Sequence, residues 1–271
     1  MKQPILLTLA LLFAAAAYGR QTEIPYGNNP DAGHYANING VRMYYEIYGE
    51  GEPLLLIHGN GGSIQGHAKR IEHFKDTYKV IAADSRAHGK SQDIGDSLTY
   101  RNMAGDLNTL LDTLGIDSCY IWGQSDGGIL GLHLAMDYPD KVKRLAIFGA
   151  NLKPDTTAVF TSIANWVDET LAKTTDEHQK RLFHLLKYQP QIEIEELAAI
   201  QVPVLIMSGD RDVIRLEHSL QIFYSIPQSN LFIMPGATHF GSYEKPDLFN
   251  KVLEDFFTKP FTTQATTDIF K

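Results

Sequence analysis

The sequence predicts an α/β fold organised around a mainly parallel β-sheet. From residue 53 onward, short apolar runs typical of buried strands alternate with longer segments of helical periodicity. Several of these runs end in turns rich in glycine, as at residues 58–63 and 123–127. Parallel strands need crossover connections, so this alternation favours strand–helix–strand units. With 271 residues, 44% of them hydrophobic, the chain suffices for one large domain or a domain with an insertion.

A β-hairpin is expected at the start of the fold. Asn39-Gly40 separates residues 35–38 from residues 41–48 and is a preferred pair for the type I′ turn of a two-residue hairpin. Apolar and less apolar residues alternate along 41–48. We therefore expect one face of that strand to be buried.

Periodicity predicts the remaining elements. The continuous apolar runs, typical of strands covered on both faces, are residues 53–57, 78–83, 119–122, 142–148, 202–207 and 230–234. The segments with apolar residues at helical spacing are residues 65–74, 100–114, 216–224 and 248–257, and a segment that begins at Asp126.

Residues 155–200 interrupt the alternation, because they contain helical stretches and no strand-like run. We interpret them as a helical cap inserted between two strands of the sheet. The alternative is a single helical crossover, for which about 45 residues is long. The expected organisation is a signal peptide (1–19), a first part of the core (20–154), the cap (155–200), a second part of the core (201–258) and a polar C-terminal tail (259–271).

The N-terminus has the pattern of a secretory signal peptide. Lys2 supplies a positive charge, residues 5–17 are almost wholly apolar, and Ala17-Tyr18-Gly19 places small residues at the −3 and −1 positions. An uncleaved anchor is the alternative, but the run is shorter than the roughly 20 residues that span a bilayer. We expect cleavage after Gly19, export to the periplasm or the medium, and no stable membrane insertion afterwards.

The composition limits the classes of partner and cofactor that we expect for this protein. The formal net charge is −8, which does not favour a nucleic-acid partner. Cys119 is the sole cysteine, so an intramolecular disulfide is excluded, and we expect it to be a buried core residue. The sequence contains neither the H-E-x-x-H pattern nor paired cysteines, so it predicts no metal and no cofactor.

The strongest motif is Gly123-Gln-Ser125-Asp-Gly127, which matches G-x-S-x-G. An apolar strand precedes it and a helix-periodic segment follows, which is the context this motif requires. Glycines at both ends remove Cβ atoms that would clash in so tight a turn. Ser125 would then be exposed at the C-terminal edge of the sheet. The alternative is a glycine-rich turn that contains a serine by chance.

Four strands are followed by loops with chemically active side chains: residues 58–63 (HGNGGS), 123–127 (GQSDG), 209–212 (GDRD) and 237–239 (ATH). The order serine, aspartate, histidine is that of the α/β-hydrolase fold, and the chain resembles the α/β-hydrolase family over nearly all its mature length. Residues 84–91 also resemble that family's D-x-R-G-x-G-x-S segment, with Ala87 in place of the usual glycine. The resemblance implies a mostly parallel eight-stranded sheet with helices on both faces and an inserted helical cap.

The resemblance and the chemistry suggest a catalytic triad. A serine hydroxyl is a weak nucleophile until a base takes its proton, so Ser125 is paired with His239 as the base. Asp212 would hold the imidazole in the required tautomer, with Asp210 as the alternative acid. The competing histidines are His58, which more often shapes the glycine turn, His88, and His133, which is expected to point away from the loops.

Two backbone N–H groups are expected to form the oxyanion hole. Asp126 follows the nucleophile and supplies one. Asn60 supplies the other, with Gly61 as the alternative. The Asp126 carboxylate has two interpretations: it caps the new helix, or it also pairs with a cationic amine on the substrate.

The predicted function is a secreted serine hydrolase that cleaves small carboxylic esters through an acyl-enzyme. Residues 121–152, with GQSDGG, Tyr138-Pro139 and residues 148–151 (FGAN), are similar to the biphenyl-hydrolase-like proteins that cleave amino-acid esters. That similarity implies a preference for α-amino esters. The alternatives are a lactonase, a thioesterase, a carbon–carbon bond hydrolase or a cofactor-free haloperoxidase, and, from another class, a non-catalytic binding protein on the same fold.

Overall fold

The computed structural model describes residues 24–95 and 97–270, so the expected signal peptide lies outside the described residues. The described chain forms one eight-stranded sheet in the order β1-β2-β4-β3-β5-β6-β7-β8. Its strands are β1 (Gly33–Ile38), β2 (Val41–Tyr48), β3 (Glu52–Ile57), β4 (Tyr78–Ala83), β5 (Cys119–Gln124), β6 (Val142–Phe148), β7 (Val204–Gly209) and β8 (Ser229–Met234). β1 and β2 are antiparallel, β2 is antiparallel to β4, and the other neighbours are parallel. The mainly parallel sheet is therefore confirmed.

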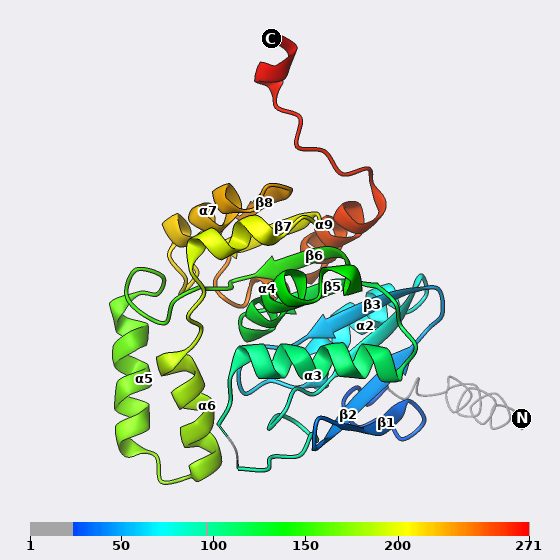
Figure 1. Cartoon of the computed structure of the whole chain (residues 1–271), viewed down its shortest axis with the longest axis vertical. Coiled ribbons are helices and arrows are strands. Elements are labelled where there is room, and N and C mark those ends of the chain that lie inside the picture. Colours follow the sequence, from blue (N-terminus) through cyan, green and yellow to red (C-terminus); the bar gives the residue numbers. More distant parts are fainter. Residues whose placement is uncertain (1–23, 96, 271) are drawn as a thin grey trace, which may run out of the picture.

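Helices cover both faces of the sheet, as Figure 1 shows. The α-helices are α2 (Ala68–Phe74), α3 (Tyr100–Thr113), α4 (Asp126–Asp137), α5 (Thr161–Lys173), α6 (Glu177–Tyr188), α7 (Leu216–Ser225), α8 (Gly241–Glu244) and α9 (Pro246–Thr258). The short 3₁₀ helices are η1 (Ile64–His67), η2 (Pro139–Lys141), η3 (Ile194–Ala199) and η4 (Thr266–Phe270). The sequence pattern missed α8, since a single turn carries no periodicity.

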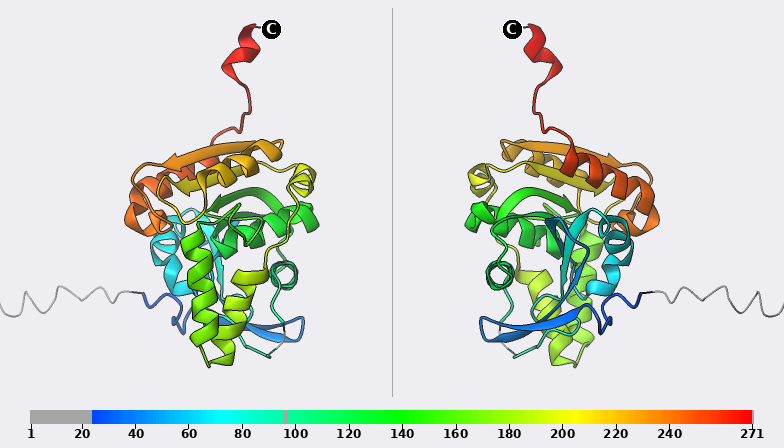
Figure 2. Two further views of the ribbon diagram at one scale, coloured as in Figure 1. Left: turned by 90° about the vertical axis from the view of Figure 1, so that its left-hand side faces the viewer. Right: turned by 90° about the vertical axis from the view of Figure 1, so that its right-hand side faces the viewer.

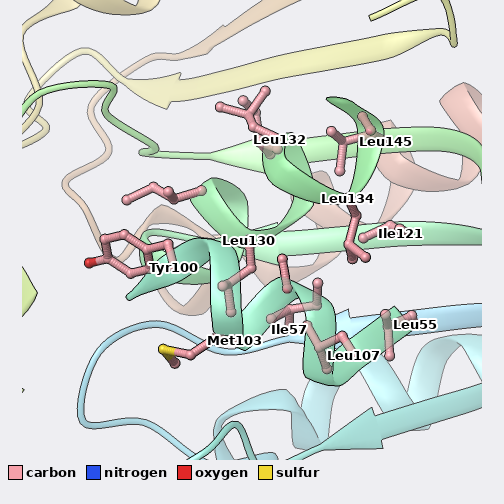
Figure 3. Close-up of a cluster of buried hydrophobic side chains, with 14 of the residues drawn as sticks. Leu55, Ile57, Tyr100, Met103, Leu107, Ile121, Leu130, Leu132, Leu134 and Leu145 are labelled. Atoms are coloured by element: carbon pink, nitrogen blue, oxygen red, sulfur yellow. The ribbon is translucent and has the colours of Figure 1, made fainter. Parts of the chain in front are cut away.

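Two hydrophobic layers hold the helices on the sheet. Leu55 and Ile57 of β3 point into the layer beneath α3, α4 and α7, whereas Leu54 and Leu56 point into the layer beneath α2 and α9. Successive side chains of a strand alternate between faces, so an apolar run is buried on both. Figure 3 shows the first layer, where leucines of α3 and α4 pack against β3, β5 and β6. Cys119 is fully buried, as expected.

The hairpin turn has the expected geometry. Asn39 and Gly40 have φ angles of 47° and 82°, the positive values that a type I′ turn requires at both central residues. The expected single buried face of β2 is wrong, however, because its second face is covered by residues 24–32. There Glu46 is fully buried and accepts hydrogen bonds from the hydroxyls of Tyr44 and Tyr48, at 2.6 and 2.7 Å.

The segment between β6 and β7 leaves the layers of the core. Figures 1 and 2 show α5 and α6 side by side, beyond the C-terminal ends of the parallel strands. The return segment behaves differently: η3 packs against α4 and α7, and Leu197 within it is fully buried. The cap over the sheet edge is therefore mainly the α5–α6 pair.

The C-terminal residues extend away from the body in both figures and end in η4. None of the helices in residues 24–95 and 97–270 has the length and apolar character needed to cross a bilayer.

Candidate active site

Ser125 lies in a strained turn between β5 and α4. Its φ of 54° is in the left-handed region, which is sparsely populated for residues with a Cβ and costs about 1–3 kcal/mol. The flanking glycines make the turn possible. A Cβ on Gly123 would lie 2.1 Å from the carbonyl oxygen of Gly127, and a Cβ on Gly127 would lie 2.1 Å from the carbonyl oxygen of Ile57 in β3. The sequence around Ser125 is thus fitted to present its hydroxyl at the sheet edge.

His239 and Asp212 come together from the loops after β8 and β7. The Nδ1 atom of His239 lies 2.6 Å from Oδ1 of Asp212, whose side chain is fully buried. The Asp212 carboxylate also accepts the backbone N–H of Ile214 at 3.1 Å and the Ser208 hydroxyl at 3.5 Å. An acceptor on Nδ1 fixes the tautomer in which Nε2 is free to accept a proton. Asp210 takes no part in this contact: it is exposed and accepts the backbone N–H of Ala237 at 3.3 Å.

Gly149 packs against both His239 and Asp212, and it was assigned no role in the site from the sequence. It follows β6 with a φ of 64°, and a Cβ there would lie 2.7 Å from Cε1 of His239 and 3.2 Å from Oδ2 of Asp212. The sequence signal was present in the glycine that ends β6. Its meaning depends on two loops about 60 and 90 residues further along the chain.

The glycine turn after β3 is shaped by His58, as one interpretation of the sequence proposed. Its Nδ1 contacts the carbonyl of Gly59 at 2.8 Å, and its Nε2 accepts the backbone N–H of Ser85 at 3.0 Å. Burial lowers the pKa of His58 to about 4, so the ring is neutral at pH 7. Within residues 24–95 and 97–270, the backbone N–H of Asn60 has no hydrogen-bond partner, which leaves it available to a ligand.

Asp126 lies beside the nucleophile at the start of α4, and its carboxylate is enclosed. Asn60 Nδ2 donates to its Oδ2 at 3.0 Å, and the hydroxyl of Tyr100 is also hydrogen-bonded to it. Burial raises the pKa of Asp126 to about 6, and these two hydrogen bonds oppose that shift. Asn60 Nδ2 also donates to the backbone carbonyl of Leu182 in α6 at 3.2 Å, so this amide links the cap to Asp126. Sequence reasoning missed Tyr100, since nothing in a helix start identifies such a contact.

Ser125, Asp126, Asn60 and His239 line one cavity of about 1210 Å³. Asp212 lies behind His239, outside the lining. The far wall comes from α5 and α6 and is largely apolar, with Ile163, Val167, Leu182, Phe183 and Leu186. A chamber of this size and character accommodates a small organic substrate whose bulk packs beneath the cap.

Of the competing histidines, His58 lines the cavity but is committed to the glycine turn, and His88 and His133 lie outside the lining. His88 is buried, contacts the carbonyl of Arg86 at 2.9 Å and has a pKa lowered to about 4, mainly by burial. His133 lies on α4 with its Nδ1 3.8 Å from Asp137. Within the described residues, no group of three or more His, Cys, Asp or Glu side chains is placed to hold a metal ion.

A profile of the family described as alpha/beta hydrolase fold matches residues 52–188, which is more than half of the chain. The chain belongs to the α/β-hydrolase fold family. It is 27% identical to a protein named putative carbamate hydrolase RutD from Azorhizobium caulinodans, over 82% of this chain and 97% of that protein. It is also 27% identical to the serine hydrolase BPHL of Mus musculus, over 81% and 84% of the two chains.

Solved structures show the same fold. MGS-M2, an α/β hydrolase from a deep-sea metagenome library, aligns with a TM-score of 0.78 at 20% identity and covers 85% of this chain and 99% of its own. The enol-lactonase of Burkholderia xenovorans aligns with a TM-score of 0.71 at 21% identity, over 83% and 100%. These structures show the α/β-hydrolase fold, and the proteins they represent are named for different reactions.

Proposed function

We propose that this protein is a serine hydrolase that cleaves small carboxylic esters through an acyl-enzyme. The observation that carries the proposal is the arrangement of Ser125 and His239 on one cavity, with Asp212 hydrogen-bonded to the ring at 2.6 Å. Those three residue types in that order along the chain are the α/β-hydrolase nucleophile, acid and base.

The proposed reaction assigns each group one task. His239 takes the proton of the Ser125 hydroxyl as the oxygen attacks the ester carbonyl, and later returns it to the leaving alcohol. Asp212 stabilises the imidazolium that forms between these steps. The backbone N–H groups of Asn60 and Asp126 stabilise the oxyanion, a contribution of about 3–4 kcal/mol for each such donor. Water then releases the acyl group by the same route.

A fluorophosphonate probe and p-nitrophenyl acetate test this proposal. We expect the probe to label wild-type protein at Ser125 and the Ser125→Ala variant to lose nearly all ester hydrolysis while keeping its fold. His133→Gln is the matched control, since His133 lies outside the cavity lining, and its activity should be close to that of the wild type. A protein that is neither labelled nor active would instead be a binding protein on this fold. Retained hydrolysis in Ser125→Ala would refute the nucleophile.

The Asp126 carboxylate supports a preference for α-amino esters within this function. It lies beside Ser125, is 4% exposed and lines the cavity, so a cationic amine on the acyl group could pair with it in a largely dry site. Its position in the first turn of α4 equally suits a helix-terminal role, because acids are favoured there. The two roles are compatible, and the comparison of substrates described in the Discussion separates them.

Other hydrolase chemistry is the main alternative, because the similar proteins are named for several different reactions. They include a carbamate hydrolase, a 2-hydroxy-6-oxononadienedioate hydrolase and an enol-lactonase. A panel of esters, lactones, thioesters and carbamates of similar size would rank these activities. An ester rate below those of the other classes would replace the ester assignment while leaving the serine mechanism in place.

We also propose that the protein is exported. The support is the sequence of residues 1–19 alone, with Lys2, the apolar run and the small residues before Gly19. Mass spectrometry of exported protein should give a mature N-terminus at Arg20. An intact Met1 on exported material would contradict cleavage.

A further inference from the structure

Gln124 is the last residue of β5 and immediately precedes Ser125, yet its side chain faces the loop that carries His239. Its Nε2 atom donates to the backbone carbonyl of His239 at 3.2 Å. The residue is 5% exposed, so this contact is made away from bulk water. The same turn that presents the nucleophile therefore also holds the backbone of the histidine.

The orientation of this amide is set by Ser242 in α8. The Ser242 hydroxyl donates to Oε1 of Gln124 at 2.7 Å, and the residue is fully buried. A carbonyl accepts and does not donate, so the amide nitrogen of Gln124 must face His239 and its oxygen must face Ser242. Both polar ends of the glutamine are thus satisfied in one orientation.

A buried arginine, Arg70, is hydrogen-bonded to the backbone of Ser242. Arg70 of α2 is 1% exposed and donates through Nη2 to the backbone carbonyl of Ser242 and through Nη1 to Oδ1 of Asn250, the latter at 2.9 Å. Its guanidinium lies 5.2 Å from the ring centre of Phe249. Burying a guanidinium is costly unless it is hydrogen-bonded, so α8 is fixed strongly to α2 and α9 at this point.

This hydrogen-bond network affects the position of His239, the proposed base. His239 lies in the loop between β8 and α8, outside any strand or helix, and Asp212 holds its ring from one side. The flanking backbone is tied within the loop and to α8, since Thr238 N–H donates to Glu244 at 3.0 Å and Gly241 N–H donates to the Thr238 carbonyl at 3.0 Å. The Gln124 amide adds a direct link from the nucleophile's strand to the backbone carbonyl of His239. Catalysis by general base transfer needs the ring nitrogen within hydrogen-bond reach of the serine, and an error of about 1 Å can lower a rate roughly 100-fold.

We propose that Gln124 is a positioning residue for His239: held by Ser242, it fixes the backbone of the proposed base relative to Ser125, the residue next to it in the chain. This inference rests on the proposed function, because it assigns His239 the role of base. It gives a role to the buried, doubly hydrogen-bonded amide at the position before the nucleophile.

Gln124→Met tests the proposal, since methionine has a similar shape and makes neither hydrogen bond. We expect kcat for p-nitrophenyl acetate to fall roughly 10- to 100-fold with KM little changed. The second readout is the downfield proton NMR signal of the short Nδ1–H bond between His239 and Asp212, assigned by its absence in His239→Gln. It should broaden or vanish in Gln124→Met. Ser242→Ala should shift both readouts in the same direction, to a smaller extent.

Ser219→Ala is the matched control, because Ser219 is a serine of similar burial in α7, outside this network, and both readouts should match those of the wild type. A folded Gln124→Met protein with unchanged kcat and an unchanged signal would overturn the proposal. If Gln124→Met does not fold, Ser242→Ala decides by the same criteria. The NMR signal needs no substrate, so a wild type inactive on every ester would refute the proposed function and leave the positioning test intact.

Discussion

Substrate preference should depend on pH in a way set by Asp126. The carboxylate has a pKa raised to about 6 by burial, so it is ionised at pH 7 and largely protonated at pH 4.5. An α-amino group on the substrate is cationic below about 7.7. The proposed ion pair is therefore available between about pH 6 and 7.7, and is lost on the acid side when Asp126 takes a proton.

The size of the substrate preference follows from the ionised fraction of Asp126. A partly desolvated, charge-assisted pair contributes about 1.5–3 kcal/mol, which corresponds to a preference of roughly tenfold to 150-fold in kcat/KM. At pH 4.5, about 3% of Asp126 is ionised, so the preference should fall to roughly one- to sixfold. The neutral partner hydroxyl of Tyr100 does not alter this, since burial raises its pKa well above the ordinary value.

The assay compares an amino-acid benzyl ester with its des-amino analogue between pH 4.5 and 8.5. Both esters are proposed to react through the same catalytic steps, so pH effects on those shared steps cancel in the ratio of the two kcat/KM values, which reports the free enzyme and free substrate. In Asp126→Asn the ratio should stay near one across the range. A wild-type ratio near one at every pH would leave Asp126 as a helix-terminal residue. A high ratio that does not change between pH 4.5 and 7 would assign amine recognition to another group.

Three further predictions follow from the geometry. Asp212→Asn should lower kcat by orders of magnitude because it disturbs the histidine tautomer, whereas Asp210→Asn should do far less; the reverse ranking in steady-state kinetics would assign the acid to Asp210. Gly149→Ala should lower both the melting temperature and kcat. Alanine at a φ of 64° costs about 1 kcal/mol, and its Cβ would displace the His239 ring. A variant with the wild-type melting temperature and kcat would contradict this contact. Burial lowers the folded-state pKa values of His58 and His88 to about 4, so between pH 6.5 and 4 these residues take up protons mainly in the unfolded state. The stability that these two rings contribute is therefore complete above pH 6.5 and should fall below it by about 1.4 kcal/mol per pH unit for each ring. In urea unfolding from pH 7.5 to 4.5, His58→Gln and His88→Gln should each show a smaller loss of stability than the wild type, and equal slopes would be inconsistent with neutral buried rings.

The fold could be predicted well because its signals are local. Each parallel strand contains a short apolar run, and such a run can be recognised from a few consecutive residues without knowledge of the rest of the chain. The prediction was wrong where the burial of a residue depends on a segment that is distant in the sequence. The second face of β2 was expected to be open, and only the packing of the segment before β1 over Glu46 shows why it is closed.

The loops of the site could be recognised for the same reason, since residues 123–127 and 209–212 each carry a pattern within a few positions. The contacts that position the groups of the site could not be recognised from the sequence. Gly149, Gln124 and Tyr100 contact residues that are distant in sequence, and each is an ordinary residue type for a strand end or a helix start. No local propensity distinguishes a glutamine that bonds to a loop 115 positions away from one that faces solvent.

Asn60 and Asp126 show how the two kinds of information combine. Both were selected from sequence for their backbone N–H groups, one within the glycine turn and one directly after the nucleophile. The structure adds that their side chains are hydrogen-bonded to each other across 66 positions, and that Asn60 reaches a carbonyl of the cap. A movement of α6 would therefore act on the amide that helps to hold the Asp126 carboxylate, beside the backbone groups proposed to bind the oxyanion. The Asn60 side chain thus links the cap to the carboxylate beside the proposed oxyanion hole, so Asn60→Ala, which keeps the backbone N–H, should still change both the α-amino ester preference and kcat in the assay above.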